Sequence, residues 1–579
     1  MPVATRMTDF LPPGGIPELF YRRAEARADR PFLHRWAGEG WTAWTWRETA
    51  ARVSALARDL ARRGVGRGDR VALVSENRVE WQVSALAIMT TGAMHVPLST
   101  SGTPDEWRQI LASATPCGAI VSGAQRAKYD AAAAAAGRSG WRLDLDDPGP
   151  EGWPARAATA GSAPPLASAL DDVCCLIFTS GTGGAPKGVE QTHRNILANA
   201  MGAADNLSAY GIGDERFLSF LPLSHTYEHT AGFITPVALG AEIFVSRGPE
   251  HFARELRTAA PTVLIVVPRF CEVMQQRIAA GLARQSALKR RLFAVTERIG
   301  RRQAAGTAAG PGARLWMGTI GARVKRQLRD HFGGAVKCML SAGAPLRADT
   351  SLFFNGLGLP LHEGYGQTEA APGITMQRRG MIRPGTVGTP MTGMELRLAD
   401  DGEILARGPN VMRGYWQDPA TTAATLADGW LHTGDIGRLE PDGSLVIVDR
   451  KKDFLKTAGG DMIAPQPLEL ALTAQPGIGQ AMVVGDNWPH LAVLIVPDTP
   501  IREAAAAGRL TAADVTAQAQ AAVDAVNRTL PAKRRLRRLA VVLQPFTVEN
   551  GQLTGTLKVR RRRVLEAHAT VIAGLREGG

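Results

Sequence analysis

A run of glycines and hydroxyl side chains follows an apolar segment and has the composition of a phosphate-binding loop. Residues 173–178 read VCCLIF, and residues 179–188 read TSGTGGAPKG. Glycines leave backbone N–H groups accessible, while hydroxyls and the ammonium of Lys187 can bind phosphate oxygens. Gly188 stands where the usual P-loop has Ser or Thr after its lysine, so we expect a different kind of nucleotide loop. A flexible surface turn is the alternative interpretation.

Four further segments carry side chains suited to nucleotide chemistry. Residues 221–229, LPLSHTYEH, place two histidines, a tyrosine and a carboxylate in a loop interrupted by proline. Residues 361–369, LHEGYGQTE, offer an aromatic ring for stacking on a base and an acid able to hold a hard cation. Residues 431–435, LHTGD, put a carboxylate after a glycine, which suits ribose hydroxyls, and residues 553–558, LTGTLK, present a lysine in a turn. Each segment alone is also compatible with an ordinary loop.

Length and composition indicate a multidomain globular protein. The chain has 579 residues, more than one hydrophobic core usually supports, so we expect two or more domains. Its 45% hydrophobic and 21% charged residues are ordinary for a soluble protein. The net charge of +13 is concentrated in basic runs at residues 289–291, 533–538 and 560–563. Such runs attract nucleotide phosphates, nucleic acid or anionic membranes, or are simply solvated faces, so charge alone identifies no partner.

The cysteines and the N-terminus favour a cytoplasmic location. The five cysteines form no C-x-x-C pair and no plausible metal spacing with the 11 histidines, so we expect a reducing compartment and no metal site at them. The N-terminal residues around Arg6 lack the apolar region of a signal peptide. Since no uninterrupted apolar stretch approaches about 18 residues, the sequence predicts no membrane-spanning helix.

Strand-like and helix-like segments alternate through most of the chain. Residues 48–62 and 79–90 have helical patterns, and residues 70–74 between them read as a strand. This alternation predicts an α/β fold with a parallel sheet. Residues 131–165 are rich in Ala, Gly and Pro and lose periodicity, so we expect a variable surface segment inside a domain there.

The pattern changes after about residue 395 to short strands joined by Asp-Gly turns. Residues 395–398 and 403–406 flank one such turn, and residues 444–448 follow another. Short strands joined in this way predict antiparallel structure. The charged residues 449–453, DRKKD, are a candidate hinge, because they follow a strand and have no apolar face. The remaining residues, about 125, are enough for one small α+β domain.

Together and in this order, these segments resemble the AMP-forming acyl-CoA synthetases of the adenylate-forming enzyme superfamily. The resemblance covers roughly residues 15–570. Similarity to the long-chain fatty acid CoA ligase branch is carried by residues 221–230, 261–274, 364–369 and 456–467. It implies a large N-terminal domain of α/β layers with mixed and parallel sheets and a β-rich subdomain, a hinge, and a small mobile α+β C-terminal domain with the catalytic lysine. The implied boundaries are 1–450, 451–452 and 453–579.

The resemblance implies a two-step reaction. ATP would activate a fatty acid of medium to long chain to acyl-AMP and pyrophosphate, and CoA would then take the acyl group, giving acyl-CoA and AMP. The attack joins two anions, so the site must supply positive charge, including Mg²⁺. An adenylating enzyme that transfers the acyl group to a carrier protein or another acceptor is the alternative. A third hypothesis, a non-catalytic protein that binds nucleic acid, is disfavoured because Glu369, Asp435 and Lys558 occur together.

The resemblance also implies roles for individual residues. The phosphate loop would hold the β- and γ-phosphates, the tyrosine would pack on adenine, the paired acid and arginine would hold the ribose, and the lysine near the C-terminus would bridge carboxylate and α-phosphate. The implied ATP-binding residues are Thr179, Ser180, Gly181, Thr182, Gly183, Gly184, Lys187, Gly343, Ala344, Pro345, Tyr365, Gly366, Asp435 and Arg450. The implied catalytic residues are Lys558, Thr368, Glu369, which is also the Mg²⁺ ligand, and His225; Lys452 is the hinge, and Gly459 and Gly460 line the CoA tunnel.

Two residues depart from the family pattern. Gly183 stands where the family usually has Thr or Ser, which removes one hydroxyl from the phosphate loop. Gly555 replaces a proline common in the long-chain branch, which should loosen the turn before Lys558. We expect Gly183 to weaken ATP binding. We expect Gly555 to leave the charge of Lys558 in place.

Residues 282–302 are a candidate for peripheral membrane attachment. The apolar stripe would consist of Leu282, Leu288, Leu292, Val295 and Ile299 among basic side chains. Such a helix can lie on an anionic membrane surface. An ordinary packed helix with a basic outer face is the favoured alternative, and the sequence makes no prediction of oligomeric state.

Overall fold

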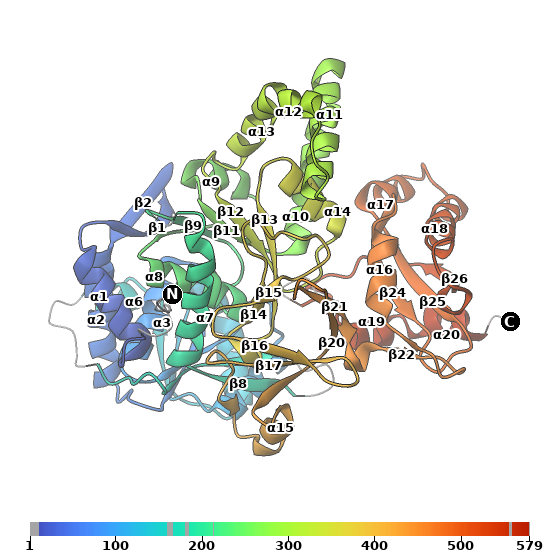
Figure 1. Ribbon diagram of the computed structural model, residues 1–579. Coiled ribbons are helices and arrows are strands. Elements are labelled where there is room, and N and C mark those ends of the chain that lie inside the picture. Colours follow the sequence, from blue (N-terminus) through green and yellow to red (C-terminus); the bar gives the residue numbers. More distant parts are fainter. Residues whose placement is uncertain (1–10, 159–165, 180–184, 212, 555–558, 578–579) are drawn as a thin grey trace. The chain divides into compact units, whose positions relative to one another are not determined.

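The computed structural model describes residues 11–158, 166–179, 185–211, 213–554 and 559–577 (Figure 1). The chain divides into two compact units. The first unit comprises Met1–Leu396 and Ala406–Leu431, and the second comprises Arg397–Leu405 and His432–Gly579. Each unit is described by itself below.

The first unit contains a seven-stranded sheet in the order β18-β8-β7-β4-β3-β5-β6. The strands β7, β4, β3, β5 and β6 pair in parallel, whereas β8 returns antiparallel to β7 and β18 pairs antiparallel with β8. The bounds are β3 Arg70–Val74, β4 Met94–Pro97, β5 Gly118–Val121, β6 Trp141–Asp144, β7 Val173–Thr179, β8 Lys187–Thr192 and β18 Gly414–Tyr415. The strands β4 and β5 are buried along their whole length, as is typical of parallel strands covered on both faces.

A nine-stranded sheet follows the order β15-β14-β13-β12-β11-β9-β10-β1-β2. Its middle strands are parallel, and antiparallel pairs close both edges. The bounds are β1 Pro31–Ala37, β2 Gly40–Thr45, β9 Arg216–Ser219, β10 Glu242–Val245, β11 Val263–Val266, β12 Cys338–Ser341, β13 Leu361–Gly366, β14 Gly373–Met376 and β15 Thr389–Pro390. The predicted α/β class with mixed and parallel sheets is confirmed.

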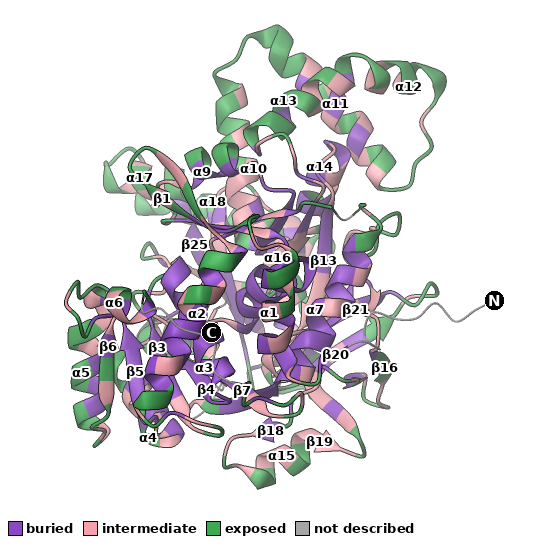
Figure 2. Ribbon diagram, turned by 90° about the vertical axis from the view of Figure 1, so that its left-hand side faces the viewer, coloured by how far each residue is buried: buried purple, intermediate pink, exposed green. Residues whose placement is uncertain are grey.

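Buried helices join the two sheets. Every residue of α3 (Val79–Thr90) is buried, and the helix contacts β1 of the nine-stranded sheet as well as β3 and β4 of the seven-stranded sheet. A helix that is buried on all sides belongs inside a core, and the few polar side chains of α3, such as Glu80 and Gln82, are buried with it. The same hydrophobic cluster includes residues of α1 (Gly15–Ala26), α2 (Trp46–Arg62), α7 (His193–Ser208) and α8 (Thr235–Leu239). Figure 2 shows the strands and helices around this cluster as largely buried.

The local patterns predicted from the sequence match these elements closely. The predicted strand at 70–74 and helix at 79–90 have the bounds of β3 and α3. The predicted helix at 48–62 begins two residues earlier, because Thr45 and Glu48 form a reciprocal capping box ahead of Trp46. The remaining helices of the first unit are α4 Pro104–Ala114, α5 Arg126–Ala135, α6 Trp153–Ala157, α9 Phe252–Ala259, α10 Pro268–Ala283, α11 Ala287–Ala304, α12 Pro311–Gly318, α13 Ile320–His331, α14 Ala348–Gly356 and α15 Pro419–Thr425.

Residues 131–165 lie inside the first unit, as predicted, and most of the described residues in this range are exposed or half-buried. The segment nevertheless contains regular structure and buried anchors. The strand β6 forms the edge of the seven-stranded sheet, and Trp153 is only 3% exposed. The indole Nε1 of Trp153 donates a hydrogen bond to Ser84 Oγ at 2.9 Å, within the central core. Isolated anchors in an Ala- and Gly-rich background leave no periodic signal, which is why the pattern missed them.

The continuous apolar stripe considered at 282–302 is not present, whereas the favoured alternative, a packed helix with a basic outer face, matches α11. Leu282 belongs to α10, which ends at Ala283, and α11 begins only at Ala287. The buried residues of α11 are Phe293, Thr296 and Gly300. A Cβ at Gly300 would lie 2.1 Å from the carbonyl oxygen of Gly356, so this face of α11 packs closely on α14. Among the described residues, no helix is both long enough and apolar enough to cross a membrane.

The later part of the chain is built from short strands and a smaller α+β body. A five-stranded sheet has the order β16-β17-β20-β19, with β21 paired antiparallel to β20. Its bounds are β16 Glu395–Leu398, β17 Glu403–Arg407, β19 Leu426–Ala427, β20 Trp430–Leu439 and β21 Leu445–Arg450. The body that follows contains β22 Leu455–Lys456, β23 Met462–Ile463, α16 Pro465–Thr473, β24 Ile478–Val484, β25 Leu491–Pro497, α17 Thr499–Ala506, α18 Ala512–Asn527, β26 Leu536–Val541, α19 Arg561–Ala567 and α20 Ala569–Glu577.

The central helix α3 should dominate the stability of the first unit. Leu86 is 0% exposed in α3, so Leu86→Ala should lower the free energy of unfolding by about 2–5 kcal/mol through lost burial and a cavity. Leu288, on α11, is 66% exposed, so Leu288→Ala should change it by less than about 0.5 kcal/mol. Denaturant unfolding of both variants measures the difference. Equal effects would contradict the central role of α3.

Candidate active site

The carboxyl ends of parallel strands bring three of the predicted segments to one edge of the nine-stranded sheet. The strands β9, β11, β12 and β13 run parallel in this sheet. The chain leaves β9 into residues 220–229, β12 into residues 342–347, and β13 into residues 367–369. In open α/β sheets, ligands bind in the crevice beyond this edge.

Gly366 sets the turn that presents Thr368 and Glu369. A Cβ at Gly366 would lie 1.9 Å from the carbonyl oxygen of Pro372, so no other residue fits without a backbone shift. The same oxygen accepts a hydrogen bond from the N–H of Gln367 at 2.9 Å. A short 3₁₀ helix, η4 (Thr368–Ala370), follows directly. Tyr365, in β13 beside this turn, is partly exposed and pairs with Thr375 of β14.

A buried carboxyl group holds the loop that contains Gly343, Ala344 and Pro345. Glu363 Oε1 accepts a hydrogen bond from the N–H of Leu346 at 3.1 Å, whereas Oε2 has no partner among the described residues. Burial raises the pKa of Glu363 to about 8, so the group is protonated at neutral pH. Gly343 has a φ of +89°, a conformation that favours glycine, with open space around its Cβ position.

Gln191 links two of these segments to the seven-stranded sheet, although no sequence motif pointed to it. Its side chain is 0% exposed in β8. Gln191 Nε2 donates to the carbonyl oxygen of Thr368 at 2.8 Å and to Thr226 Oγ1 at 3.2 Å. A single buried amide therefore joins the hairpin strand β8 to η4 and to the residue after His225.

Tyr415 is a second unpredicted residue, and it contacts the expected Mg²⁺ ligand. The hydroxyl of Tyr415 donates to Glu369 Oε1 at 2.7 Å, and the Nζ of Lys187 lies 5.3 Å from the centre of its ring. Burial, followed by the nearby negative charge of Glu369, raises the pKa of Tyr415, so the phenol stays a donor. Tyr415 is held in β18 opposite Val189 of β8. Tyr415 thus contacts both groups: the ammonium of Lys187 lies near its ring, and the carboxylate of Glu369 accepts a hydrogen bond from its hydroxyl.

The predicted phosphate loop connects β7 and β8. These strands form an antiparallel hairpin in which Thr179 pairs with Lys187 and Phe178 pairs with Gly188. The predicted roles of Ser180, Gly181, Thr182, Gly183 and Gly184 fall on positions outside the described residues and stay predictions. The hairpin therefore fixes the positions at which the chain leaves β7 and enters β8.

His225 is neutral and is held by its own turn. Its Nδ1 accepts a hydrogen bond from the N–H of Tyr227 at 3.2 Å, which leaves the proton on Nε2. Burial lowers the pKa of His225 to about 4. The prediction of a loop through 221–229 was wrong at its end, because Glu228 and His229 begin a π-helical segment, Glu228–Ile234. Such segments are rare and often occur at functional sites.

Asp435 and Arg450, the predicted ribose ligands, are neighbours on adjacent strands. They face each other in the β20–β21 ladder, and Arg450 Nε lies 3.3 Å from Asp435 Oδ1. Asp435 is 5% exposed, so the carboxylate is buried against its partner. The ion pair therefore holds the side chains of Asp435 and Arg450 next to each other.

The residues predicted to form the hinge and to line the CoA tunnel lie in turns of the second unit. Lys452 belongs to a 3₁₀ turn, η5 (Lys451–Asp453), directly after β21. Gly459 and Gly460 form the exposed turn between β22 and β23, where Gly460 has a φ of +83°. Lys533, from one of the basic runs, lies 3.1 Å from Asp461 beside this turn.

The catalytic lysine predicted at Lys558 lies outside the described residues, as does Gly555. The two residues on either side of this segment, Leu553 and Val559, form an antiparallel bridge. The roles predicted for Lys558 and Gly555 stay predictions.

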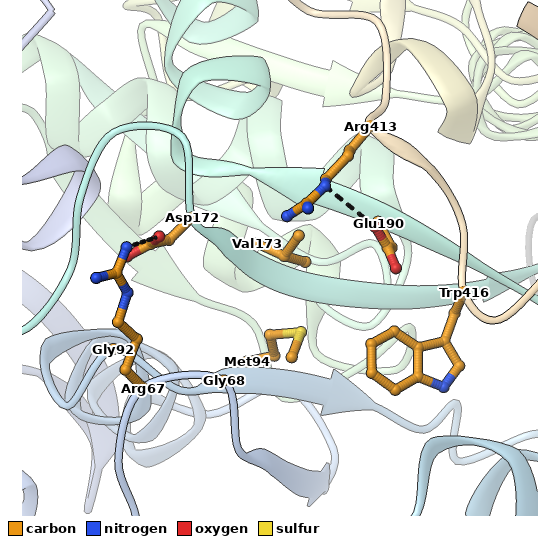
Figure 3. A pocket seen from close by; sticks show the side chains of 9 residues that line it. All are labelled: Arg67, Gly68, Gly92, Met94, Asp172, Val173, Glu190, Arg413 and Trp416. Atoms are coloured by element: carbon orange, nitrogen blue, oxygen red, sulfur yellow. Dashed lines mark hydrogen bonds and ion pairs between the residues drawn. The ribbon is translucent and has the colours of Figure 1, made fainter.

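A separate pocket in the first unit contains none of the predicted site residues (Figure 3). Its charged side chains pair with one another, Arg67 with Asp172 at 2.5 Å and Arg413 with Glu190 at 3.8 Å. It lies beside Val173 and Met94, the first residues of β7 and β4, whereas Thr179 and Lys187 are at the other end of the hairpin. We therefore do not assign it to the site.

Comparison with known proteins shows the family. Residues 20–416 match the family described as AMP-binding enzyme, and residues 452–578 match the AMP-binding enzyme C-terminal domain. The chain belongs to the AMP-binding enzyme family. The expected class, an AMP-forming acid–thiol ligase that uses ATP with Mg²⁺ and has CoA as cosubstrate, is confirmed at this level.

Relatives of this AMP-binding enzyme cover almost its whole length. It is 33% identical over 563 residues to the long-chain-fatty-acid–CoA ligase FadD15 of Mycobacterium bovis and to that of Mycobacterium tuberculosis, with 92% of each chain covered. A crystal structure of the anthranilate CoA ligase AuaEII in complex with anthranoyl-AMP has a TM-score of 0.76 at 20% identity, covering 98% of this chain and 100% of that one. That likeness confirms the fold.

The residues of the AMP-binding enzyme fit Mg²⁺ at the predicted position. Thr368 and Glu369 present oxygen donors, which this hard cation prefers. The hydrogen bond from Tyr415 occupies one carboxylate oxygen of Glu369 and fixes the direction of the other. The donor set therefore suits one Mg²⁺ shared with phosphate oxygens.

Glu363 should make the stability of the AMP-binding enzyme depend on pH. Its folded pKa of about 8 lies above the ordinary 4.5, so its contribution is complete below pH 4.5 and is lost as the pH rises toward 8. Gln cannot ionise. Glu363→Gln should therefore gain stability relative to the wild type over this window, by up to about 1 kcal/mol per pH unit.

Urea unfolding at several pH values between 5 and 8 measures this difference. The exposed Glu39→Gln serves as the control and should leave the pH profile unchanged. A stability difference for Glu363→Gln that does not vary with pH would contradict a protonated Glu363.

Proposed function

We propose that this enzyme converts a fatty acid of medium to long chain to acyl-AMP and pyrophosphate, and then transfers the acyl group to CoA, giving acyl-CoA and AMP. The observation that carries the adenylation step is the meeting of the β7–β8 hairpin with Thr368 and Glu369 through Gln191 and Tyr415. The substrate class is supported by the two fatty-acid–CoA ligases that are 33% identical to this chain.

The first half-reaction needs positive charge and oriented donors around the α-phosphate. The carboxylate oxygen attacks the α-phosphorus, and the bond to the pyrophosphate oxygen breaks. Lys187, at the start of β8, supplies a cation at the edge of the loop, and the hydroxyl of Thr368 supplies a donor. Mg²⁺ bound through Glu369 offsets the charge of the phosphates. Tyr365 and the loop at Gly343–Pro345 form the proposed faces of the adenine site.

The second half-reaction uses residues of the second unit. We propose that Lys558 bridges the carboxylate and the α-phosphate during adenylation and that rotation at Lys452 then removes it. The exposed turn at Gly459 and Gly460 leaves room for the thin pantetheine chain, and Lys533 beside it supplies charge for a CoA phosphate. His225 is neutral at working pH, so it can sit beside an acyl chain at low desolvation cost. The domain boundaries proposed with this scheme are 1–450, 451–452 and 453–579.

A carrier-protein acceptor is the competing function, and one assay separates the two. Acid-dependent exchange of pyrophosphate into ATP should occur with fatty acids in a series of chain lengths, and should be largely lost in Lys558→Ala. AMP release should then be accelerated by CoA and not by holo carrier protein. Acceleration by carrier protein alone would overturn the CoA assignment, and absence of exchange with every fatty acid would overturn the substrate class.

Tyr415→Phe tests the proposed role of Glu369 without removing the carboxylate. Loss of the hydroxyl frees Glu369 Oε1 from its 2.7 Å hydrogen bond, so Mg²⁺ affinity or the rate of adenylation should fall by about 10–100-fold. Raised Mg²⁺ should restore part of the rate. Tyr21→Phe, which removes a hydroxyl 3.1 Å from Ser54 in the same unit, should leave both unchanged. A Tyr415→Phe enzyme with the wild-type Mg²⁺ dependence would refute the role.

We also propose a cytoplasmic location. Attachment to an anionic membrane surface is a separate hypothesis, supported by the exposed Leu288 and the neighbouring exposed residues 289–291 at the start of α11. Sedimentation with vesicles that contain anionic lipid, compared at low and high salt, tests it.

A further inference from the structure

Two histidines and a cysteine meet in the core of the first unit, beside residues of the proposed active site: Cys175 pairs with Gln191, and the N–H of His229 donates to the carbonyl oxygen of His225 at 2.9 Å. His95 lies in β4, Cys175 in β7 and His229 in the π-helical segment Glu228–Ile234. One nitrogen of each imidazole and the Sγ of Cys175 all lie within 4.8 Å of one another, and all three residues are 0% exposed. Figure 2 shows β4 and β7 as buried strands. The expectation that the cysteines have no metal partner was based on sequence spacing and missed this group.

His95 is oriented toward the cysteine by a backbone hydrogen bond. Its Nδ1 lies 3.0 Å from the carbonyl oxygen of Cys174, which can only accept, so Nδ1 carries the proton. The lone pair is therefore on Nε2, which lies 3.2 Å from Cys175 Sγ. Histidines that bind metals are typically held by this kind of hydrogen bond from their other nitrogen.

His229 is the observation that an ordinary Cys–His hydrogen bond does not explain. Neither of its ring nitrogens has a hydrogen-bond partner among the described residues. Its ring lies 4.9 Å from that of His95, and the apolar rings of Trp81 and Phe233 lie 6.1 and 6.0 Å away. A buried polar group without a hydrogen-bond partner costs free energy. A ligand that accepts an imidazole lone pair at this place would remove that cost.

We propose that His95, Cys175 and His229 bind one thiophilic metal ion, Zn(II) or Cu(I). One sulfur and two imidazole nitrogens are the donor set that these ions prefer, whereas Mg²⁺ prefers oxygen. Three ligands about 2.0–2.3 Å from one ion lie roughly 3.3–4.0 Å apart. Since the three atoms lie within 4.8 Å of one another, small side-chain rotations bring them to binding distance. The metal–sulfur bond forms as the S–H proton leaves to solvent, and the oxidation state of the ion does not change.

The ion would tie together parts of the chain that are far apart in sequence. His95 and Cys175 are paired residues on adjacent strands of the seven-stranded sheet. His229 follows His225 in the segment that leaves β9 of the nine-stranded sheet. The role is structural, because all three residues are 0% exposed and are therefore inaccessible to a substrate from solvent.

Metal content of the refolded full-length chain tests the proposal. Because the site is buried, the wild type is unfolded and refolded with Zn(II), or with Cu(I) under reducing conditions, and excess ion is removed with a chelator. We expect about one ion per chain and release of about one proton per ion. Cys175→Ser and His229→Phe should each lower the bound metal by more than about tenfold.

Cys174→Ser is the matched control. Cys174 is the neighbouring buried thiol, and its Sγ lies 3.5 Å from the carbonyl oxygen of Gln191 and outside the cluster, so this variant should bind metal like the wild type. X-ray absorption of the loaded wild type should show one sulfur and two imidazole nitrogens, and it decides the question even if Cys175→Ser does not fold. Three results would each overturn the proposal. The first is wild-type protein that binds neither Zn(II) nor Cu(I). The others are loss of bound metal in Cys174→Ser equal to that in Cys175→Ser, and a coordination shell that contains no sulfur.

Discussion

Burial of α3 on every side is the constraint on which the first unit depends. This helix touches β1 on one sheet and β3 and β4 on the other, so neither sheet can move without opening the common core. The chemistry-bearing loops are attached to the ends of strands in those sheets. Close packing around a fully buried helix therefore sets the distance between the phosphate hairpin and the edge that carries η4.

Hydrogen bonds then orient the side chains that close packing has brought together. Gln191 spans from the hairpin to Thr368 and Thr226, and Tyr415 spans from β18 to Glu369. Each is a single hydrogen-bonding side chain in mostly buried surroundings. There, a buried group left without a hydrogen bond costs more free energy than a formed hydrogen bond gains. The site is thus specified by a few donors whose loss would leave buried acceptors without partners.

Local sequence patterns predicted much of this arrangement. Strand β3, helix α3 and the short strands β16, β17 and β21 follow from periodicity and turn residues, and the glycine-rich and acidic segments pointed to nucleotide chemistry. Gln191 and Trp153 escaped prediction because each makes its decisive contact with a residue far along the chain. The cluster of His95, Cys175 and His229 did so for the same reason, since metal-ligand spacing is recognisable only when the ligands are close in sequence.

The β7–β8 hairpin has a consequence for engineering. Its last pair, Thr179 with Lys187, closes the ladder just before the glycine-rich segment, and Gly188 is packed against Leu176 and Phe178 directly behind it. Even an alanine in place of Gly188 would press on Leu176, Phe178 and Trp416, because its Cβ would lie 3.0–3.1 Å from their side chains. Redesign of this hairpin is therefore limited by the packing behind Gly188, and other positions on the two strands are better places to introduce changes.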